Sequence, residues 1–236
     1  MAGNLDLSPS GARGITRTGW LDSRHTFSFG DYHDPAHTGF GVLRVLNEDR
    51  VAPGAGFPAH SHRDAEIISI VLSGALEHRD SMGNGSIIRP GDVQRMSAGS
   101  GVRHSEFNPS ATEPVHFLQI WLLPHTAGLA PGYAEKAFAQ FGRRNTWQTI
   151  VTGNGEDGAL MMNQDAALRL ADLAAAAKLA RTVPEGRVGW LQVISGGIGL
   201  AGHTLKAGDG IAALQQGAYM LNATENATLL AFDLPD

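Results

Sequence analysis

Residues 54–66 are Gly-Ala-Gly-Phe-Pro-Ala-His-Ser-His-Arg-Asp-Ala-Glu, and this stretch indicates both the fold and the chemistry of the chain. His60 and His62 are two positions apart, so on a β-strand both imidazoles lie on the same face. By the same alternation Glu66 shares their parity and could join them. The stretch therefore predicts a strand that presents metal-ligating side chains to one side.

A second pair of this kind follows in residues 102–108, Val-Arg-His-Ser-Glu-Phe-Asn. His104 and Glu106 again share a face of a strand. A single His-x-His pair is more often a surface pair, but a second same-face pair, with turn residues between the two, favours a metal site. If the two strands are neighbours inside a barrel, three imidazoles and a carboxylate converge. Such donors suit iron, nickel, copper, zinc, manganese or cobalt.

The rest of the chain is punctuated at short intervals by turn-forming residues. Apolar runs end in Gly, Pro, Asn or Asp, and they cover residues 40–46, 66–72, 117–123, 188–194 and 228–232. Asn84-Gly85 and Pro90-Gly91-Asp92 are strong turn signals. This pattern predicts an all-β sandwich or barrel.

Two segments have helical features. Pro131 to Phe141 has a proline near its start and Ala, Glu, Lys and Gln inside, which predicts a short helix or helical turns. The alanines of residues 166–180 favour a helix by propensity. Leu168 and Leu170, however, flank a charged residue, so we expect strand, loop, strand there.

Three short motifs occur twice in the same order. Residues 70–74, 89–92 and 121–124 of the first half resemble residues 192–196, 206–209 and 232–235 of the second. Three matches in order indicate two copies of one β-unit, the second of them shorter.

The composition narrows the functional classes. The chain has 236 residues, 30 of them Gly and 10 of them His, with no Cys and a net charge of -5. Without Cys, disulfides, Cys-based zinc sites and Cys nucleophiles are excluded. The negative charge argues against direct nucleic-acid binding. No apolar run is long enough for a membrane span, and the start lacks a signal-peptide pattern. We expect a cytoplasmic protein.

Several segments resemble those of the pirin family, which are bicupins of the cupin superfamily. They are residues 20–29, 82–84, 96–99, 104–106 and 119–121. The resemblance implies an all-β bicupin of two stacked antiparallel β-barrels, of the double-stranded β-helix or jelly-roll type, with short helical segments, and a monomer. Together with the repeat, it predicts a metal-binding barrel over residues 1–130, a linker over 131–147 and a degenerate barrel over 148–236.

The resemblance also implies one metal ion in the first barrel, Fe(II) before zinc, nickel, cobalt, manganese or copper. The ligands carried over are His60, His62, His104 and Glu106. In many cupins the glutamate of the first motif is a ligand, but in pirins the glutamate after the second-motif histidine takes that part. We therefore expect Glu66 beside the site as a hydrogen-bond partner. The alternative is a structural carboxylate paired with an arginine.

The other histidines carry less information. Residues 169–196 contain none, and His203 next to a probable turn glycine predicts an exposed loop residue. The second barrel therefore has no metal set in the sequence. His78 precedes the Asn84-Gly85 turn and could lie either at the barrel mouth or in a hairpin.

Within this family the chain resembles bacterial pirin-like quercetin 2,3-dioxygenases. It implies an oxidoreductase that cleaves a flavonol such as quercetin with O2, in which Glu106 or Glu66 accepts the hydroxyl proton. The alternative is a non-enzymatic metal- or redox-sensing regulator that binds a transcription factor or a metabolic enzyme. A third hypothesis is a bicupin scaffold that binds no metal.

Overall fold

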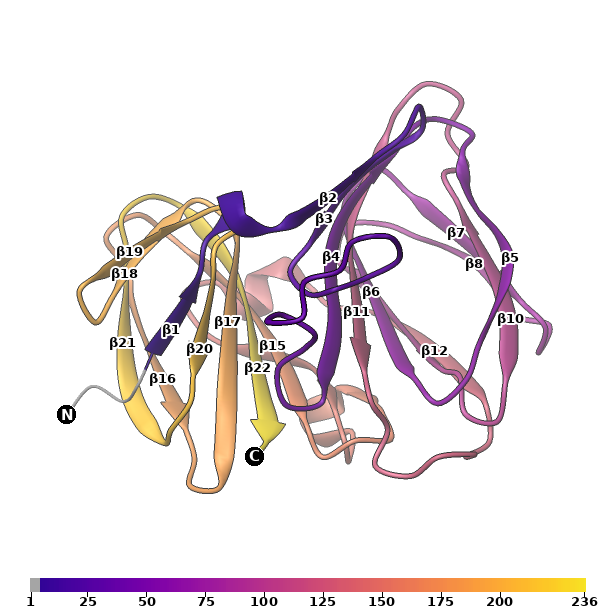
Figure 1. Ribbon diagram of the computed structural model, residues 1–236. Coiled ribbons are helices and arrows are strands. Elements are labelled where there is room, and N and C mark those ends of the chain that lie inside the picture. Colours follow the sequence, from indigo (N-terminus) through magenta and orange to yellow (C-terminus); the bar gives the residue numbers. More distant parts are fainter. Residues whose placement is uncertain (1–4) are drawn as a thin grey trace. The chain divides into compact units, whose positions relative to one another are not determined.

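The structure is a computed structural model and describes residues 5–236 (Figure 1). These residues form twenty-two β-strands and no α-helix, so the all-β prediction is confirmed. The only helical elements among them are the short 3-10 helices η1 (Ser10–Ala12), η2 (Gln140–Arg143) and η3 (Glu156–Gly158). No helix of the described residues is long and apolar enough to span a membrane.

The chain divides by its contacts into two units, which we call the N-terminal and the C-terminal barrel. The N-terminal barrel comprises residues 14–138 and 162–164. Of the described residues, the C-terminal barrel comprises 5–13, 139–161 and 165–236.

The N-terminal barrel is built from a large and a small antiparallel sheet. The large sheet contains β2 (Gly14–Arg17), β3 (Leu21–His25), β4 (Leu43–Val51), β6 (Glu66–Ser73), β9 (Asp92–Ser97), β11 (Val115–Leu122) and β12 (Gly132–Ala137), in the order β12-β9-β6-β11-β4-β3-β2. The small sheet contains β5 (Gly56–His62), β7 (Leu76–Asp80), β8 (Gly85–Ile88) and β10 (Val102–Phe107), in the order β5-β10-β7-β8.

Apolar side chains from both sheets meet inside this barrel. The large sheet contributes Val51, Val71 and Phe117, and the small sheet contributes Leu76 and Ile88, all of them buried. These positions fix the inward face of each strand, because side chains alternate between the two faces. On β6, for example, the residues that share the face of Val71 point inward.

The C-terminal barrel repeats this arrangement. Its large sheet contains β1 (Leu5–Ser8), β13 (Gln148–Thr152), β14 (Leu160–Met161), β15 (Ala167–Leu173), β17 (Arg187–Ser195), β20 (Gly210–Ala213) and β22 (Ala227–Pro235), in the order β1-β20-β17-β22-β15-β13-β14. The small sheet contains β16 (Lys178–Val183), β18 (Gly197–Leu200), β19 (His203–Lys206) and β21 (Gly217–Ala223), in the order β16-β21-β18-β19.

The turns before β9 and β20 show the sequence repeat in atomic detail. The carboxylate of Asp92 accepts the backbone N–H of Arg89 at 2.8 Å. The carboxylate of Asp209 accepts the backbone N–H of Lys206 at 2.9 Å. The glycine before each aspartate has a positive φ, 100° at Gly91 and 85° at position 208. The two copies of the motif therefore form the same turn at corresponding places.

The prediction of helix between Pro131 and Phe141 is wrong for most of that segment. Residues 132–137 form β12, which pairs with the free side of β9, and only residues 140–143 are helical. An unpaired edge of a sheet offers a row of backbone partners, and these outweigh local helix propensity. The second ambiguous segment forms β15, a loop and β16, as predicted.

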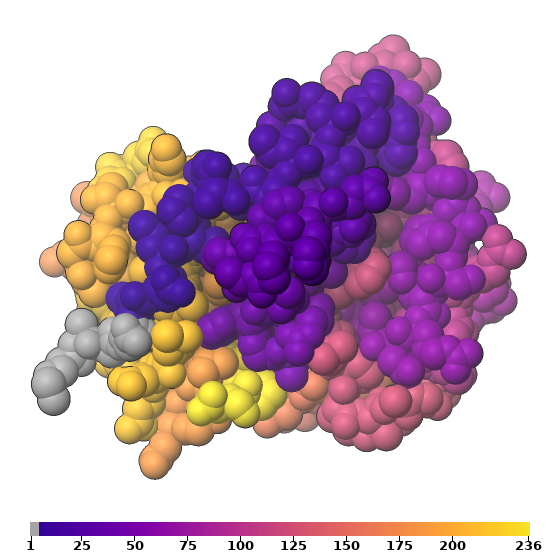
Figure 2. Space-filling view, viewed as in Figure 1, coloured from indigo at the N-terminus to yellow at the C-terminus, as the bar shows by residue number. Residues whose placement is uncertain are grey.

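The first described strand belongs to the C-terminal barrel. β1 pairs with β20, from Leu5 opposite Ala213 to Ser8 opposite Gly210. It has the place in this barrel that β12 has in the N-terminal barrel. In Figure 2 the first of the indigo residues lie on the yellow and orange surface of the C-terminal barrel.

Candidate metal centre

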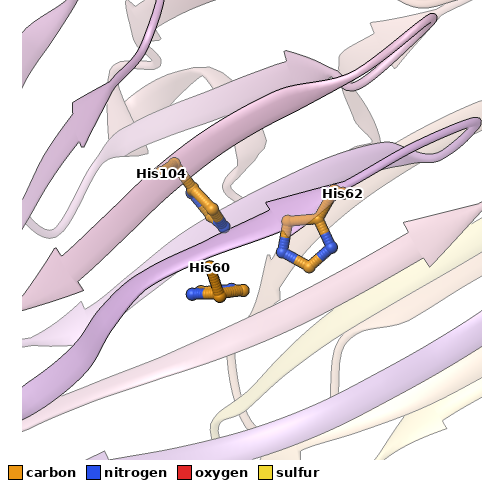
Figure 3. Close-up of side chains that lie close together, drawn as sticks. All are labelled: His60, His62 and His104. Atoms are coloured by element: carbon orange, nitrogen blue, oxygen red, sulfur yellow. The ribbon is translucent and has the colours of Figure 1, made fainter.

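Three histidines meet where β5 and β10 pair. The register of the two strands places His104 directly opposite His60. The ring centroids lie 4.6 Å apart for His60 and His62, 4.6 Å for His60 and His104, and 4.8 Å for His62 and His104. One ligand nitrogen of each ring lies within 4.8 Å of the others. Figure 3 shows the three rings close together.

The nitrogens of these rings are arranged for coordination. His60 Nδ1 lies 2.8 Å from the carbonyl oxygen of Pro58, so it donates there and leaves Nε2 with a lone pair. Nε2 of His62 and Nε2 of His104 are buried and have no hydrogen-bond partner. A buried nitrogen that lacks a partner is destabilising unless something binds it. The residues present therefore fit a metal ion.

The charge state of the rings agrees with this fit. Burial, with the neighbouring His60, lowers the pKa of His62 to about 4. Burial and the other imidazoles lower the pKa of His104 to about 2. Both rings are therefore neutral at physiological pH, and a metal ion binds the neutral form of imidazole.

Glu106 lies next to His104 on β10 but apart from the other two histidines. One oxygen of its carboxylate lies within 4.8 Å of a nitrogen of His78 and of a nitrogen of His104. Its carboxylate accepts hydrogen bonds from Ser69 at 3.2 Å and from Gln119 at 2.8 Å. Burial raises the pKa of Glu106 to about 7. The structure thus brings together three of the four expected ligands and holds the fourth beside one of them.

Glu66 is not at the site, and we correct the expectation that it lies beside it. Its carboxylate accepts hydrogen bonds from Ser97 at 2.7 Å and from Asn163 at 3.0 Å. Ser69, three positions along the regular strand β6, is directed to Glu106, so Glu66 is on the opposite face. Counting alternate residues from His62 to Glu66 gives the wrong face for Glu66. Asp64, which lies between β5 and β6, has a φ of 50° and interrupts the regular alternation of a strand.

Three further residues surround the histidines, and sequence reasoning assigned none of them a role at the site. The ring of Trp121 meets that of His62 edge-on at 4.7 Å and also contacts Phe29 at 5.3 Å. Gln119 donates to Glu106. His78 is fully buried and its Nδ1 lies 3.5 Å from Nδ1 of His104. Alternation along β11 places Gln119 and Trp121 on the same face, but only strand order and register show which side chains they meet.

The C-terminal barrel shows no comparable cluster among its described residues. Its strands β16 and β21 correspond in sheet order to β5 and β10 and contain no histidine. The buried cation on β16 is Arg181, whose guanidinium donates to the carbonyl oxygen of Phe232 at 2.7 Å. A buried arginine on β16 thus gives this part of the C-terminal barrel a different chemistry from that of β5.

Comparison with known proteins finds a family model that matches each barrel. Residues 9–122 match the Pirin family model, and residues 149–234 match the model described as the quercetinase C-terminal cupin domain. The chain is 41% identical over 230 residues to a protein of Escherichia coli (strain K12) named quercetin 2,3-dioxygenase, covering 97% of this chain and 98% of that protein. It is 37% identical to a pirin-like protein of Caulobacter vibrioides, covering 97% and 99%.

The similarity extends to solved structures. The bacterial pirin YhhW from Escherichia coli, in complex with nickel(II), matches with a TM-score of 0.94 at 39% identity, covering 98% of this chain and 99% of that chain. A quercetin 2,3-dioxygenase from Acinetobacter baumannii matches with a TM-score of 0.73 at 22% identity, which shows a common fold. The histidine cluster, the two similar barrels and these matches agree. The chain therefore belongs to the pirin family and has the bicupin fold.

Proposed function

We propose that this chain is a metal-dependent dioxygenase that cleaves a flavonol such as quercetin with O2. The observation that carries the proposal is the cluster of three imidazoles, in which Nε2 of His62 and Nε2 of His104 are buried without a partner. The substrate class is supported by the relative named quercetin 2,3-dioxygenase, which matches 97% of the chain.

One divalent transition ion per chain would be held by His60, His62, His104 and Glu106. Imidazole and carboxylate suit Fe(II), which we expect first, and also zinc, nickel, cobalt, manganese and copper. The nickel(II) complex of the related bacterial pirin supports an ion of this class. When bound, the ion supplies Lewis acidity, which lowers the pKa of the flavonol hydroxyl group.

Glu106 would also hold the proton that the hydroxyl group loses. Its carboxylate has two oxygens, so one can face the ion while the other accepts a proton. In the metal-free protein burial raises the pKa of Glu106 to about 7. Ser69 and Gln119 fix the orientation of the carboxylate through their hydrogen bonds.

The aromatic rings beside His62 would receive the substrate. Trp121 and Phe29 contact each other edge-on, and Trp121 reaches the His62 ring. Aromatic side chains favour offset or edge contacts with other rings, so they suit a planar polyphenol.

The proposal is tested by quercetin turnover in protein stripped of metal and reloaded with Fe(II). We expect loss of the flavonol absorbance when O2 is admitted, and none without metal. His62→Ala should lower turnover by at least about a hundredfold, because even indirect partners of a metal ligand change affinity 10–100-fold. His203→Ala, on β19 of the other barrel, is the matched control and should behave as the unaltered protein.

Elemental analysis of the same samples separates the alternatives. Stoichiometric metal with no metal-dependent turnover would reject the dioxygenase and favour the metal-sensing regulator. Absence of metal in the reloaded protein would favour an empty scaffold.

A further inference from the structure

His78 lies against the candidate centre and has no part in the proposed reaction. It is on β7, directly opposite Glu106 of β10. The side chains of His78 and Asp80 have no exposed surface. The His78 ring is stacked on Tyr133, with 4.8 Å between centroids and 21° between planes. Its orientation is therefore fixed by packing.

Asp80 determines which nitrogen of His78 carries the proton. Asp80 Oδ1 accepts the backbone N–H groups of Met82 at 2.9 Å and of Asn84 at 3.0 Å. Its Oδ2 accepts the Asn84 side-chain amide at 2.9 Å and lies 3.2 Å from Nε2 of His78. A carboxylate surrounded by donors can only accept, so Nε2 of His78 is protonated and donates to Asp80.

The position of the proton on His78 determines which nitrogen of His104 is protonated. A neutral imidazole with Nε2–H has an acceptor at Nδ1. Nδ1 of His78 lies 3.5 Å from Nδ1 of His104, so the proton between them belongs to His104. A proton on both nitrogens would set two donors against each other. His104 is then left with its lone pair on Nε2, which is the buried nitrogen that lacks a partner.

We propose that Asp80 and His78 form a hydrogen-bond relay that fixes the tautomer of His104 and so presents its Nε2 to the metal ion. This inference rests on the metal centre of the proposed function. His78 is a positioning residue in it, because it acts through His104. Partners of this kind typically change metal affinity 10–100-fold.

A different role for His78 is that of a ligand, since His78, His104 and Glu106 also form a close group. Both nitrogens of His78 are already engaged, one by Asp80 and one by His104. The geometry therefore favours the relay, and the experiment below distinguishes the two roles.

The first measurement is the tautomer itself, by 15N NMR of the full-length, metal-free protein. Chemical shifts of imidazole nitrogens differ between protonated and unprotonated atoms. We expect His78 as Nε2–H and His104 as Nδ1–H. In Asp80→Asn the amide can face His78 in place of Oδ2, so both tautomers should reverse. The opposite tautomers in the unaltered protein would overturn the relay whether or not metal binds.

The second measurement is nickel(II) affinity by competition with a chelator. His78→Phe fills the ring position without an acceptor, whereas the side-chain oxygen of His78→Gln can accept from His104. We expect His78→Phe and Asp80→Asn to weaken binding about 10–100-fold, and His78→Gln to stay within about threefold. His116→Phe is the matched control, because His116 pairs with Glu48 on the large sheet at 2.9 Å, and it should bind as the unaltered protein.

Each outcome decides between the hypotheses. Equal losses in His78→Gln and His78→Phe would make His78 a ligand and overturn the relay. Unchanged affinity in Asp80→Asn would also overturn it. If His78→Phe does not fold, Asp80→Asn and the NMR spectrum of the unaltered protein still give the answer. Failure of the unaltered protein to bind nickel would reject the metal centre of the proposed function, while the NMR result would still show whether Asp80 and His78 fix the tautomer.

Discussion

Asp49 and Glu106 are two carboxyl groups buried in the N-terminal barrel. Burial raises the pKa of each to about 7, and the charge of Asp49 contributes to the shift at Glu106. Asp49 accepts a hydrogen bond from Ser23, which opposes the shift without cancelling it. In the metal-free protein, ionising these groups at neutral pH therefore opposes folding.

At the residue scale we predict that Asp49→Asn stabilises the metal-free protein at pH 8 and changes its stability little near pH 4. The pKa of Asp49 rises from 3.8 to about 7 on folding, so the folded protein binds more protons between these values. The free energy of unfolding of the unaltered protein therefore falls as the pH rises through this window. Asparagine removes up to about 4 kcal/mol of that fall.

Urea unfolding at a series of pH values measures this effect. Asp31→Asn, at an exposed position, is the control and should follow the unaltered protein throughout. The same pH dependence in Asp49→Asn and in the unaltered protein would contradict the prediction.

At the element scale, the tight turn between β6 and β7 depends on Gly74. Its φ is 77°, and a Cβ there would lie 2.6 Å from the carbonyl oxygen of Pro114. Gly196 has the corresponding place between β17 and β18, with a φ of 73°, and a Cβ added there would overlap the carbonyl oxygen of Asn226. Both barrels therefore require glycine at this turn, for conformation and for space.

We predict that Gly74→Ala destabilises the protein by about 2 kcal/mol more than Gly54→Ala, because overpacking against backbone adds to the strain. Gly54 also has a positive φ, 67°, but nothing lies within 4 Å of an added Cβ. Gly54→Ala should therefore lower the free energy of unfolding only by the cost of a positive φ at alanine, about 1–2 kcal/mol. The midpoints of urea unfolding of the two variants test this prediction. Equal midpoints would contradict it, because they would show that the close approach to Pro114 costs no stability.

At the scale of the whole molecule, the start of the chain completes the C-terminal barrel. β1 covers the edge of β20, and the backbone N–H of Ser10 donates to the Asp209 carboxylate at 2.7 Å. Leu5 packs against the core of this barrel. An edge strand that is covered in this way has no unpaired backbone groups on that side.

We predict that removing residues 1–8 increases hydrogen exchange along β20 (Gly210–Ala213) and leaves nickel(II) affinity unchanged. The backbone amides of β20 that face β1 lose their partners, whereas the histidines belong to the other barrel. Hydrogen exchange read by mass spectrometry measures the first effect. Exchange along β9, which has the place of β20 in the N-terminal barrel, is the internal control. Unchanged protection of β20 would show that β1 contributes nothing to its stability.

Much of the fold follows from local pattern. The short apolar runs and turn residues predict the strands, and the repeated motifs predict two similar barrels. Arg169 between two leucines correctly indicates β15, because a strand needs only alternation. Tyr133 and its neighbours form a strand instead of a helix because β9 offers them a free edge, which is information that lies outside the segment.

The sequence by itself determined the same-face pairs His60-x-His62 and His104-x-Glu106, since alternation along a strand is a local property. Only the tertiary structure decided that Glu66 faces away from the site, because a turn at Asp64 resets the parity. The tertiary structure also placed His78 against His104, and Asp80 against His78. Which face a side chain occupies depends on its own strand, whereas its neighbours depend on strand order and register, which residues distant in sequence fix together.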